Sequence, residues 1–246
     1  MDEDSSTITK MRAVTISREY GSGGGEIAAR LAKRLQWQLI DHEVVVRVAQ
    51  KLQVSEEEAE DHDERVESLA SRIFKSLQVI QPTMPVAVEI PLSIDSRAFH
   101  VARSQVIEGA VASGHVVIVG RGAQAHLAQR RDVLHVRVIA PLEARIAYVM
   151  RREGLDRAAA QARIVKKDQE HVRYLERFYH RRPSDPHLYD FVLNTGILDL
   201  DSAVDVISMI LERKARRLSV ATQELGPAVG LSRYPGQPED FRPPQK

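Results

Sequence analysis

The sequence predicts an α/β fold, a three-layer α/β/α sandwich around a parallel sheet of five strands. Short apolar, β-branched runs alternate with longer segments in which apolar residues recur at helical spacing, as in consecutive strand–helix–strand units. The strand expected at residues 115–119 is apolar throughout after His115, which is typical of a strand covered by helices on both faces. These two observations together favour a parallel sheet between two helical layers.

The first strand is expected at residues 12–17, and a glycine-rich loop and a helix at residues 27–35 follow it. Glycines let backbone N–H groups curl around an anion, and the N-terminus of the helix adds unpaired donors and a positive dipole end. A plain tight turn is the alternative. We expect a phosphate site formed by Arg18, Gly21, Ser22, Gly23, Gly24, Gly25 and Glu26.

This loop departs from the phosphate-loop pattern G-x-x-x-x-G-K-[ST]. When Gly21-Ser22-Gly23 is laid on the second half of the pattern, the lysine position is filled by Gly24 or Gly25 and the hydroxyl position by Glu26. The nearest cations are Arg18 and Arg30. Arg18 could swing over the loop, or it could be a solvated turn residue.

The second strand is expected at residues 37–40 and delivers Asp41 to the start of a helix. Asp41 is therefore either a helix cap or a ligand residue at the carboxyl edge of the sheet, and both roles are compatible. Residues 55–80 are expected to be helical, after a capping box that begins at Ser55. Three prolines make residues 81–91 a loop or an extended segment, either a flap over a site or a connector.

The strand at residues 115–119 runs into Gly120-Arg121-Gly122. Open α/β sheets bind ligands at the carboxyl ends of their strands, and the planar guanidinium of an arginine suits a phosphate. We therefore expect Arg121 to bind substrate, with a surface turn as the alternative.

Two more strands are expected at residues 133–139 and 191–194. Pro141 is expected to begin the helix after the first of these, because proline favours the first helical position. A last helix should run through Val204, Ile207 and Leu211. Residues 1–10 are expected to be a disordered lead-in, and residues 218–246 a loosely held arm rich in proline and glycine.

Residues 145–182 hold eleven basic and five acidic residues. A solvated helical face is the usual explanation of such a run. The other interpretation is a lid that brings cations over a triphosphate, where they stabilise the transferring group and exclude water.

Composition excludes several classes of protein. The net charge of +1 gives no global signal for nucleic acid or a membrane surface. The chain contains no cysteine, so disulfides, a thiol nucleophile and a cysteine-ligated zinc site are excluded. No apolar stretch reaches the ~18 residues of a membrane span, and no signal peptide is recognisable. We expect a cytoplasmic protein.

Four motifs carry a resemblance to a known family: Ile16-Ser-Arg-Glu-Tyr-Gly-Ser-Gly-Gly24, Gly120-Arg121-Gly122, the stretch from Asp168 to Tyr179, and Leu188-Tyr-Asp-Phe-Val-Leu-Asn-Thr-Gly196. Their order along the chain resembles the cytidylate kinase-like family of P-loop proteins, over about residues 11–213. The resemblance implies a kinase domain at residues 11–217, with a helical insertion for the nucleoside monophosphate at 42–113 and an arginine-rich lid at 150–182.

The resemblance also implies roles for individual residues. The loop from Gly21 to Glu26 would hold the phosphates of ATP, while Asp41 and Arg121 would face the acceptor nucleotide. Magnesium and arginines would neutralise charge during in-line transfer of the γ-phosphate. The residues that would close over the phosphoryl group are Arg145, Arg151, Arg152 and Arg173, with Asp168 orienting them; the metal ligands are left unassigned.

Two departures leave alternatives open. The loop lysine is missing, and Val119 stands where such kinases place an acid before Gly120-Arg121. A kinase that transfers phosphate from ATP to a nucleoside monophosphate, with CMP suggested by the resemblance, is the first hypothesis. A nucleotide-binding regulatory protein with little or no turnover is the second, and nucleic-acid binding through the lid is the third and is disfavoured by the near-neutral charge. The oligomeric state stays open, a homo-oligomer included.

Overall fold

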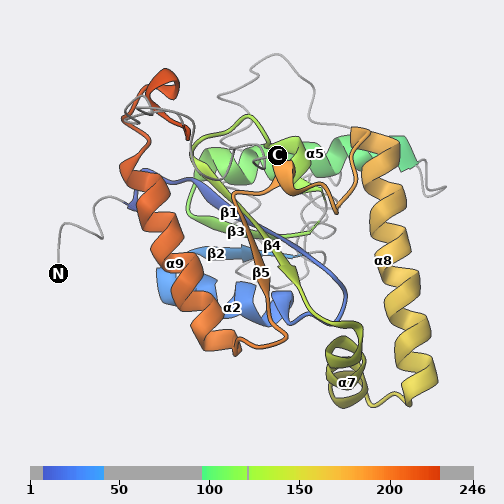
Figure 1. Cartoon of the computed structure of the whole chain (residues 1–246). Coiled ribbons are helices and arrows are strands. Elements are labelled where there is room, and N and C mark those ends of the chain that lie inside the picture. The colour runs from blue at the N-terminus through green and yellow to red at the C-terminus, as the bar shows by residue number, and fades with distance from the viewer. Residues whose placement is uncertain (1–7, 42–95, 121, 228–246) are drawn as a thin grey trace, which may run out of the picture.

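A computed structural model describes residues 8–41, 96–120 and 122–227, and in it five parallel strands form one sheet in the order β2-β3-β1-β4-β5 (Figure 1). β1 lies at the centre, paired with β3 on one side and with β4 on the other. The number of strands and their parallel arrangement confirm the fold class. The strands are β1 (Ala13–Arg18), β2 (Gln38–Ile40), β3 (Val116–Val119), β4 (Val133–Ile139) and β5 (Phe191–Asn194).

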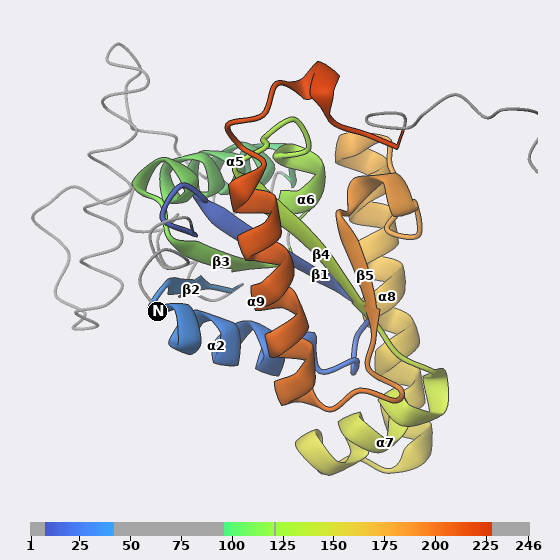
Figure 2. The same ribbon diagram turned by 60° about the vertical axis from the view of Figure 1, so that its left-hand side comes forward.

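Helices cover both faces of this sheet, which gives the three predicted layers (Figure 2). α2 (Gly24–Leu35) and α9 (Leu200–Arg216) pack on one face. α5 (Ser96–Ser113) and the short α6 (Ala123–His126) lie on the other. Because both faces are covered, β3 is buried along its whole length, as its apolar sequence predicts.

The main core forms between the sheet and the pair α2 and α9. Val14 and Ile16 of β1 point to this side, since alternate residues of a strand face the same way. Buried apolar residues recur along both helices at helical spacing, and each side chain of this size stabilises the fold by about 1.5–3 kcal/mol when buried. These helical residues include Ile27, Leu31, Val204, Ile207 and Leu211.

α7 (Leu142–Glu153) and α8 (Arg157–Tyr179) form an antiparallel pair beside the carboxyl ends of the strands (Figure 1). They share a small apolar cluster of Ile146, Val149, Ala160 and Ile164. Gly154 ends α7 in the left-handed conformation, and the carboxylate of Asp156 caps α8 by accepting the N–H of Ala159 at 2.8 Å. The arginine-rich segment is therefore two helices that pack on each other.

Several boundaries differ from the prediction by one to three residues, and the start of α7 is one of them. α7 begins at Leu142, and Pro141 precedes it as the N-cap residue with a ψ of 143°. Because this ψ is extended and not helical, Pro141 is the residue before the helix and not its first residue. The remaining described elements are two short 3₁₀ helices, Pro186–Leu188 and Thr222–Glu224.

Several expectations lie outside the described residues. They are the lead-in before residue 8, most of the insertion expected at residues 42–113, and Arg121. The same holds for the arm beyond residue 227. Among the described helices, none has the length and apolar composition that crossing a membrane requires.

Candidate functional site

The loop between β1 and α2 has the backbone shape of an anion cradle. Gly21 and Gly23 have φ angles of +83° and +79°, which side-chain-bearing residues rarely adopt. A Cβ at Gly21 would lie 2.9 Å from the carbonyl oxygen of Arg145, whereas a Cβ at Gly25 would meet no described residue within 4 Å. α2 begins at Gly24, so the N–H groups of its first turn, which no helix satisfies internally, start directly after the loop. They are positioned to bind an anion.

The loop is fastened to its neighbours through Ser22. Its hydroxyl donates to the carbonyl oxygen of Glu19 at 2.8 Å, and its own carbonyl oxygen accepts from the hydroxyl of Thr195 at 2.8 Å. Ser22 is buried, so its side chain holds the loop in shape. Glu26, in contrast, forms an ion pair with Arg152 of α7. The structure thus joins two of the predicted site residues, one from the first turn of α2 and one from the last turn of α7.

Arg145 and Asp168, both predicted at the site, meet beside the loop. One carboxylate oxygen of Asp168 accepts the N–H of Tyr20 at 2.9 Å, and the other accepts from Arg145 Nη1 at 2.6 Å. Arg145 Nε also donates to the carbonyl oxygen of Ala140 at 3.1 Å. α7 and α8 are therefore tied to the loop through one carboxylate, and Arg145 is held in a fixed orientation.

Arg18 crosses from the end of β1 over the start of α2. A Cβ at Gly24 would lie 2.8 Å from the Cβ of Arg18, and a Cβ at Gly120 would lie 2.9 Å from its Nη1. The side chain therefore fills the space between α2 and the end of β3. Burial lowers the pKa of the Arg18 guanidinium, and the negative charge of Asp41, at the end of β2, acts in the opposite direction. An arginine in this place still carries its charge at neutral pH.

A cavity of about 490 Å³ opens at the carboxyl ends of β1 and β4, under α8. Open α/β sheets bind their ligands at this edge. The cavity is lined by Arg18, Glu19, Arg137, Asp168, His171, Val172, Glu176, Arg182, Pro183 and Ser184.

Arg137 also lines this cavity, although it was not predicted as a site residue. It lies near the end of β4, its side chain is 11% exposed, and its Nη2 lies 4.0 Å from a carboxylate oxygen of Glu19. Its guanidinium also stands over the ring of Tyr189, 5.6 Å from the ring centre. An arginine inside a mainly apolar strand was the available signal, because burying a charge is costly unless it is paired.

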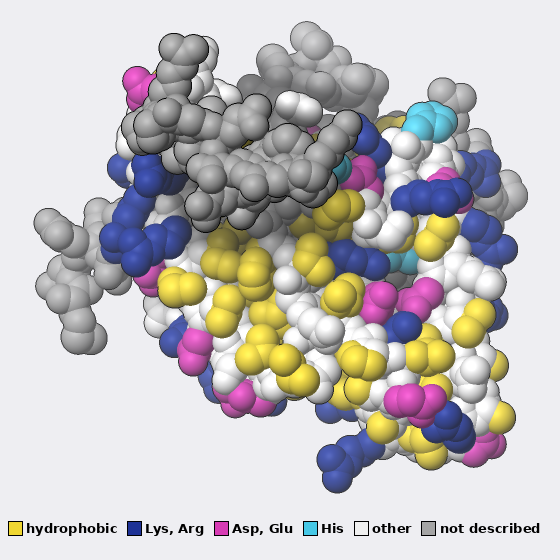
Figure 3. Space-filling view, viewed as in Figure 1, with side chains coloured by type: hydrophobic (Ala, Val, Ile, Leu, Met, Phe, Trp, Pro, Cys, Tyr) yellow, Lys and Arg dark blue, Asp and Glu magenta, His cyan; other side chains and the backbone are white. Residues whose placement is uncertain are grey.

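The other predicted lid cations lie further from the cavity. Arg151 and Arg173 are exposed and are not among the residues that line it. Basic and acidic side chains lie side by side on the surface of α7 and α8 (Figure 3). Besides Arg145 and Arg152, five of the eleven basic residues between positions 145 and 182 form ion pairs along or between these elements, namely Arg157–Glu143, Arg163–Glu153, Lys167–Glu170, Arg181–Asp185 and Arg182–Glu176.

The segment after β3 carries buried polar groups. A Cβ at Gly122 would lie 2.8 Å from the ring of Tyr179, so this glycine lets the segment pack against α8. Gln124 is fully buried, and among the described residues neither polar atom of its carboxamide has a hydrogen-bond partner. Burial raises the pKa of the Tyr179 hydroxyl. Sequence reasoning overlooked Gln124, since nothing in the sequence marks it as buried.

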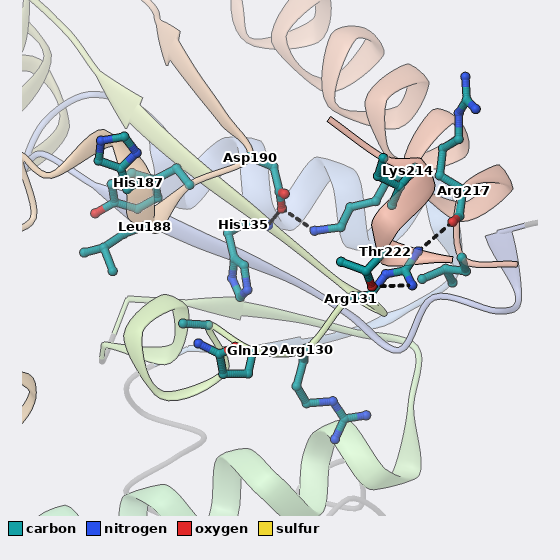
Figure 4. A pocket seen from close by; sticks show the side chains of 14 residues that line it. Gln129, Arg130, Arg131, His135, His187, Leu188, Asp190, Lys214, Arg217 and Thr222 are labelled. Atoms are coloured by element: carbon teal, nitrogen blue, oxygen red, sulfur yellow. Dashed lines mark hydrogen bonds and ion pairs between the residues drawn. The ribbon is translucent and has the colours of Figure 1, made fainter. Parts of the chain in front are cut away.

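A second cavity, of about 390 Å³, lies at the opposite end of the sheet, where β4 and β5 begin (Figure 4). The charged side chains that line it form hydrogen bonds and ion pairs with other parts of the chain. Lys214 Nζ donates to Asp190 at 2.6 Å and to the carbonyl oxygen of Val133 at 2.7 Å, and Arg131 donates to the carbonyl oxygens of Arg217 and Val220. The donors of this second cavity are thus occupied, and it lies at the amino ends of the strands. We therefore consider the cavity of about 490 Å³ at the carboxyl ends the candidate site.

Comparisons with known proteins agree with this geometry. A model of the cytidylate kinase-like family matches residues 13–197. Among curated proteins, a cytidylate kinase from Methanopyrus kandleri is 28% identical over 132 residues, which cover 50% of this chain and 64% of that protein. A uronate isomerase from Corynebacterium glutamicum is 32% identical over 105 residues, which cover 43% of this chain and 20% of that protein. The chain therefore spans less than two thirds of the length of either relative.

The fold also has a counterpart among solved structures. The crystal structure of an uncharacterized protein from Eubacterium ventriosum matches with a TM-score of 0.60 at 20% identity. The match covers 82% of this chain and 98% of that one, and it supports the arrangement of the sheet and its helices.

Proposed function

Because the chain belongs to the cytidylate kinase-like family, we propose that it transfers a phosphoryl group from ATP to a nucleoside monophosphate. The observation that carries the proposal is the meeting of three features at one edge of the sheet. They are the open first turn of α2, the cavity of about 490 Å³, and the guanidinium groups of Arg18 and Arg137 that line it. Phosphoryl transfer needs positioning and positive charge more than covalent chemistry, and these features supply both.

On the donor side, the backbone from Gly21 to Glu26 would bind the phosphates of ATP. The N–H groups of α2 supply hydrogen bonds, and the helix dipole favours the negative charge. Arg152, which pairs with Glu26, lies at the opening of the loop. Release of that pair would let Arg152 turn toward a bound triphosphate.

Magnesium would enter with ATP, where it neutralises charge on the phosphate oxygens. Mg²⁺ in such sites keeps several waters and takes only one or two carboxylates from the protein. The part of the chain that the structure describes holds no cluster of three or more His, Asp or Glu side chains able to bind a metal ion. Such a metal would be held mainly by the nucleotide, with Glu26 in the first turn of α2 and Asp41 directly after β2 as candidate carboxylates.

On the acceptor side, Asp41, Arg121 and Arg137 would bind the nucleoside monophosphate. Arg137 suits this role because it is held near the end of β4 and faces the cavity. Arg145 would stabilise charge on the transferring group, with Asp168 keeping its guanidinium in place at 2.6 Å. Arg151 and Arg173 would contribute only after α7 and α8 move closer to the loop.

The test is an assay of purified protein with ATP, Mg²⁺ and each of the common nucleoside monophosphates, CMP first. ADP and a nucleoside diphosphate should form in equal amounts. Arg137→Ala should lower the rate with the preferred acceptor by about 10²–10³, by analogy with the loss of one charge-stabilising donor. The matched control is Arg34→Ala, an exposed arginine of α2 that pairs with Asp205 and should behave as wild type. A folded protein that forms no diphosphate with any acceptor would refute the proposal.

A second function is favoured by the missing groups of the site. Gly24 stands in the lysine position, and the buried Val119 ends β3 where an acid is expected. A regulatory protein that binds a nucleotide without consuming it would need neither group. ATP would then raise the melting temperature by mass action, and chromatography of the nucleotide after hours of incubation would recover it unchanged.

A further inference from the structure

Arg18 and Gly24 occupy the two positions that a complete phosphate loop gives to glycine and lysine. In the pattern G-x-x-x-x-G-K-[ST], the second glycine precedes the lysine that reaches the β- and γ-phosphates. The structure fixes the alignment, because Gly23 is the N-cap of α2 and Gly24 is its first residue. Counting back from Gly23, the first glycine of the pattern falls on Arg18.

The side chain of Arg18 occupies the space that a side chain at position 24 would need. A Cβ at position 24 would lie 2.8 Å from the Cβ of Arg18, 3.1 Å from its Cδ and 3.5 Å from its Cγ. The stem of Arg18 therefore lies where a lysine at position 24 would begin. A lysine at position 24 and an arginine at position 18 exclude each other sterically.

The guanidinium lies at the place that a phosphate-binding cation needs. From position 24 the side chain continues to Gly120, where a Cβ would lie 2.9 Å from Nη1. This puts the charge between the start of α2 and the end of β3, on the wall of the cavity. Gly120 has a φ of +71°, so any side chain there would be strained as well as crowded.

We infer that Arg18 is the donor-phosphate cation of this protein, moved from the first turn of the helix to the end of the first strand. The inference deepens the proposed function and rests on it for the identity of the ligand. A guanidinium also offers two parallel N–H donors, so Arg18 would bind two oxygens of a triphosphate where a lysine binds as a point charge. The loop thus keeps its cation although the lysine is absent.

The test exchanges the two residues. Arg18→Gly should weaken ATP binding, measured by calorimetry with Mg²⁺ present, by about 10- to 100-fold, the range expected for lost hydrogen bonds to a charged group. Gly24→Lys alone should also weaken ATP binding, because its side chain collides with Arg18. The double variant R18G/G24K restores the G-x-x-x-x-G-K pattern and should bind ATP at least tenfold more tightly than Arg18→Gly. Glycine is required at position 18 because the Cβ of an alanine would still lie 2.8 Å from the new Cβ.

A further variant separates the charge of Arg18 from its packing, and another serves as a control. Arg18→Met keeps a stem of similar length over Gly24 without the charge, so it should lose ATP affinity as Arg18→Gly does while keeping the melting temperature of the free protein. Arg30→Ala, an exposed arginine of α2 paired with Asp201 at 2.7 Å, is the matched control and should bind ATP as wild type.

The outcomes distinguish this inference from the kinase proposal. Wild-type affinity in Arg18→Met, or a double variant no tighter than Arg18→Gly, would overturn the assignment of Arg18 even if the protein is a kinase. Binding that follows the predicted order in a protein without turnover would uphold Arg18 and refute the kinase. A wild-type protein that does not bind ATP would overturn both.

Discussion

Replacing Asp168 with asparagine tests how the loop between β1 and α2 is held in place. Asp168 lies on α8 and accepts two hydrogen bonds, from the N–H of Tyr20 at 2.9 Å and from Arg145 at 2.6 Å. Asparagine keeps the size of the side chain and one acceptor oxygen but removes the charge. The change should therefore loosen the connection between α8 and the loop without creating a cavity.

The magnitude follows from these contacts. A hydrogen bond to a charged group is worth about 1.5–3 kcal/mol. The side chain of Asp168 is 32% exposed, so water screens part of the interaction, and we take the lower end, about 1.5–2 kcal/mol. For a chain of this size each kcal/mol shifts the melting temperature by roughly 2–4 °C, so we expect a fall of about 3–8 °C. ATP affinity should fall about tenfold, since the backbone of Tyr20 loses its anchor.

The assay is thermal unfolding followed by circular dichroism, with ATP titrations on the same samples. Asp156→Asn is the matched control on the same helix. Asp156 caps α8 through the N–H of Ala159, and asparagine caps a helix equally well, so the melting temperature should not change. Asp168→Asn melting within about 1 °C of wild type, or as large a fall in Asp156→Asn, would refute the role given to Asp168.

Three further predictions concern other parts of the molecule. Gly21→Ala should lower the free energy of unfolding by at least about 2 kcal/mol and abolish ATP binding, because it combines a φ of +83° with a Cβ 2.9 Å from a backbone oxygen. Gly25→Ala should stay within about 1 kcal/mol of wild type in urea titrations, because its Cβ would meet no described residue within 4 Å. Burial lowers the pKa of His135 from 6.5 to about 4, so the unfolded chain takes up a proton that the folded one does not. The free energy of unfolding should therefore fall by up to about 1.4 kcal/mol for each pH unit below 6.5. Urea titrations at pH 7 and pH 5 should show a smaller fall in His135→Gln than in the wild-type protein. An equal fall in the two proteins would contradict this role of His135. Lys214→Met removes the donor to Asp190 and Val133, so it should cost about 1–2 kcal/mol in the same titrations, while calorimetric ATP affinity stays unchanged because the second cavity lies at the other end of the sheet.

The strands were predictable because each is encoded locally. β4 and β5 begin and end at the predicted residues, since an apolar run flanked by polar or turn-forming residues needs no distant partner to be recognised. The start of α7 was predicted one residue early, at Pro141. The backbone of a residue at a helix boundary depends on the turn before it, and sequence periodicity does not report that turn.

The site was only partly predictable, for a different physical reason. The glycine loop is a local feature and was found. Arg145 and Asp168 lie in contact, and their joint role at the site stays a prediction. The charge count over residues 145–182 could not show that many cations pair with acids across α7 and α8, because pairs such as Arg157–Glu143 and Arg163–Glu153 depend on how two helices pack. Arg137 was missed because its importance comes from the cavity, which belongs to no single segment.

The exchange between Arg18 and Gly24 illustrates the same limit at the level of a motif. A sequence pattern records which residue stands at each position, so the glycine at position 24 is read as the loss of a cation. In space, the end of β1 and the start of α2 are adjacent, and the stem of Arg18 lies 2.8 Å from where a side chain at position 24 would begin. A charge can therefore reach the same cavity from either position, provided that the other position is glycine. The departure from the pattern and the arginine at the end of the strand are then one structural change, and each explains why the other is tolerated.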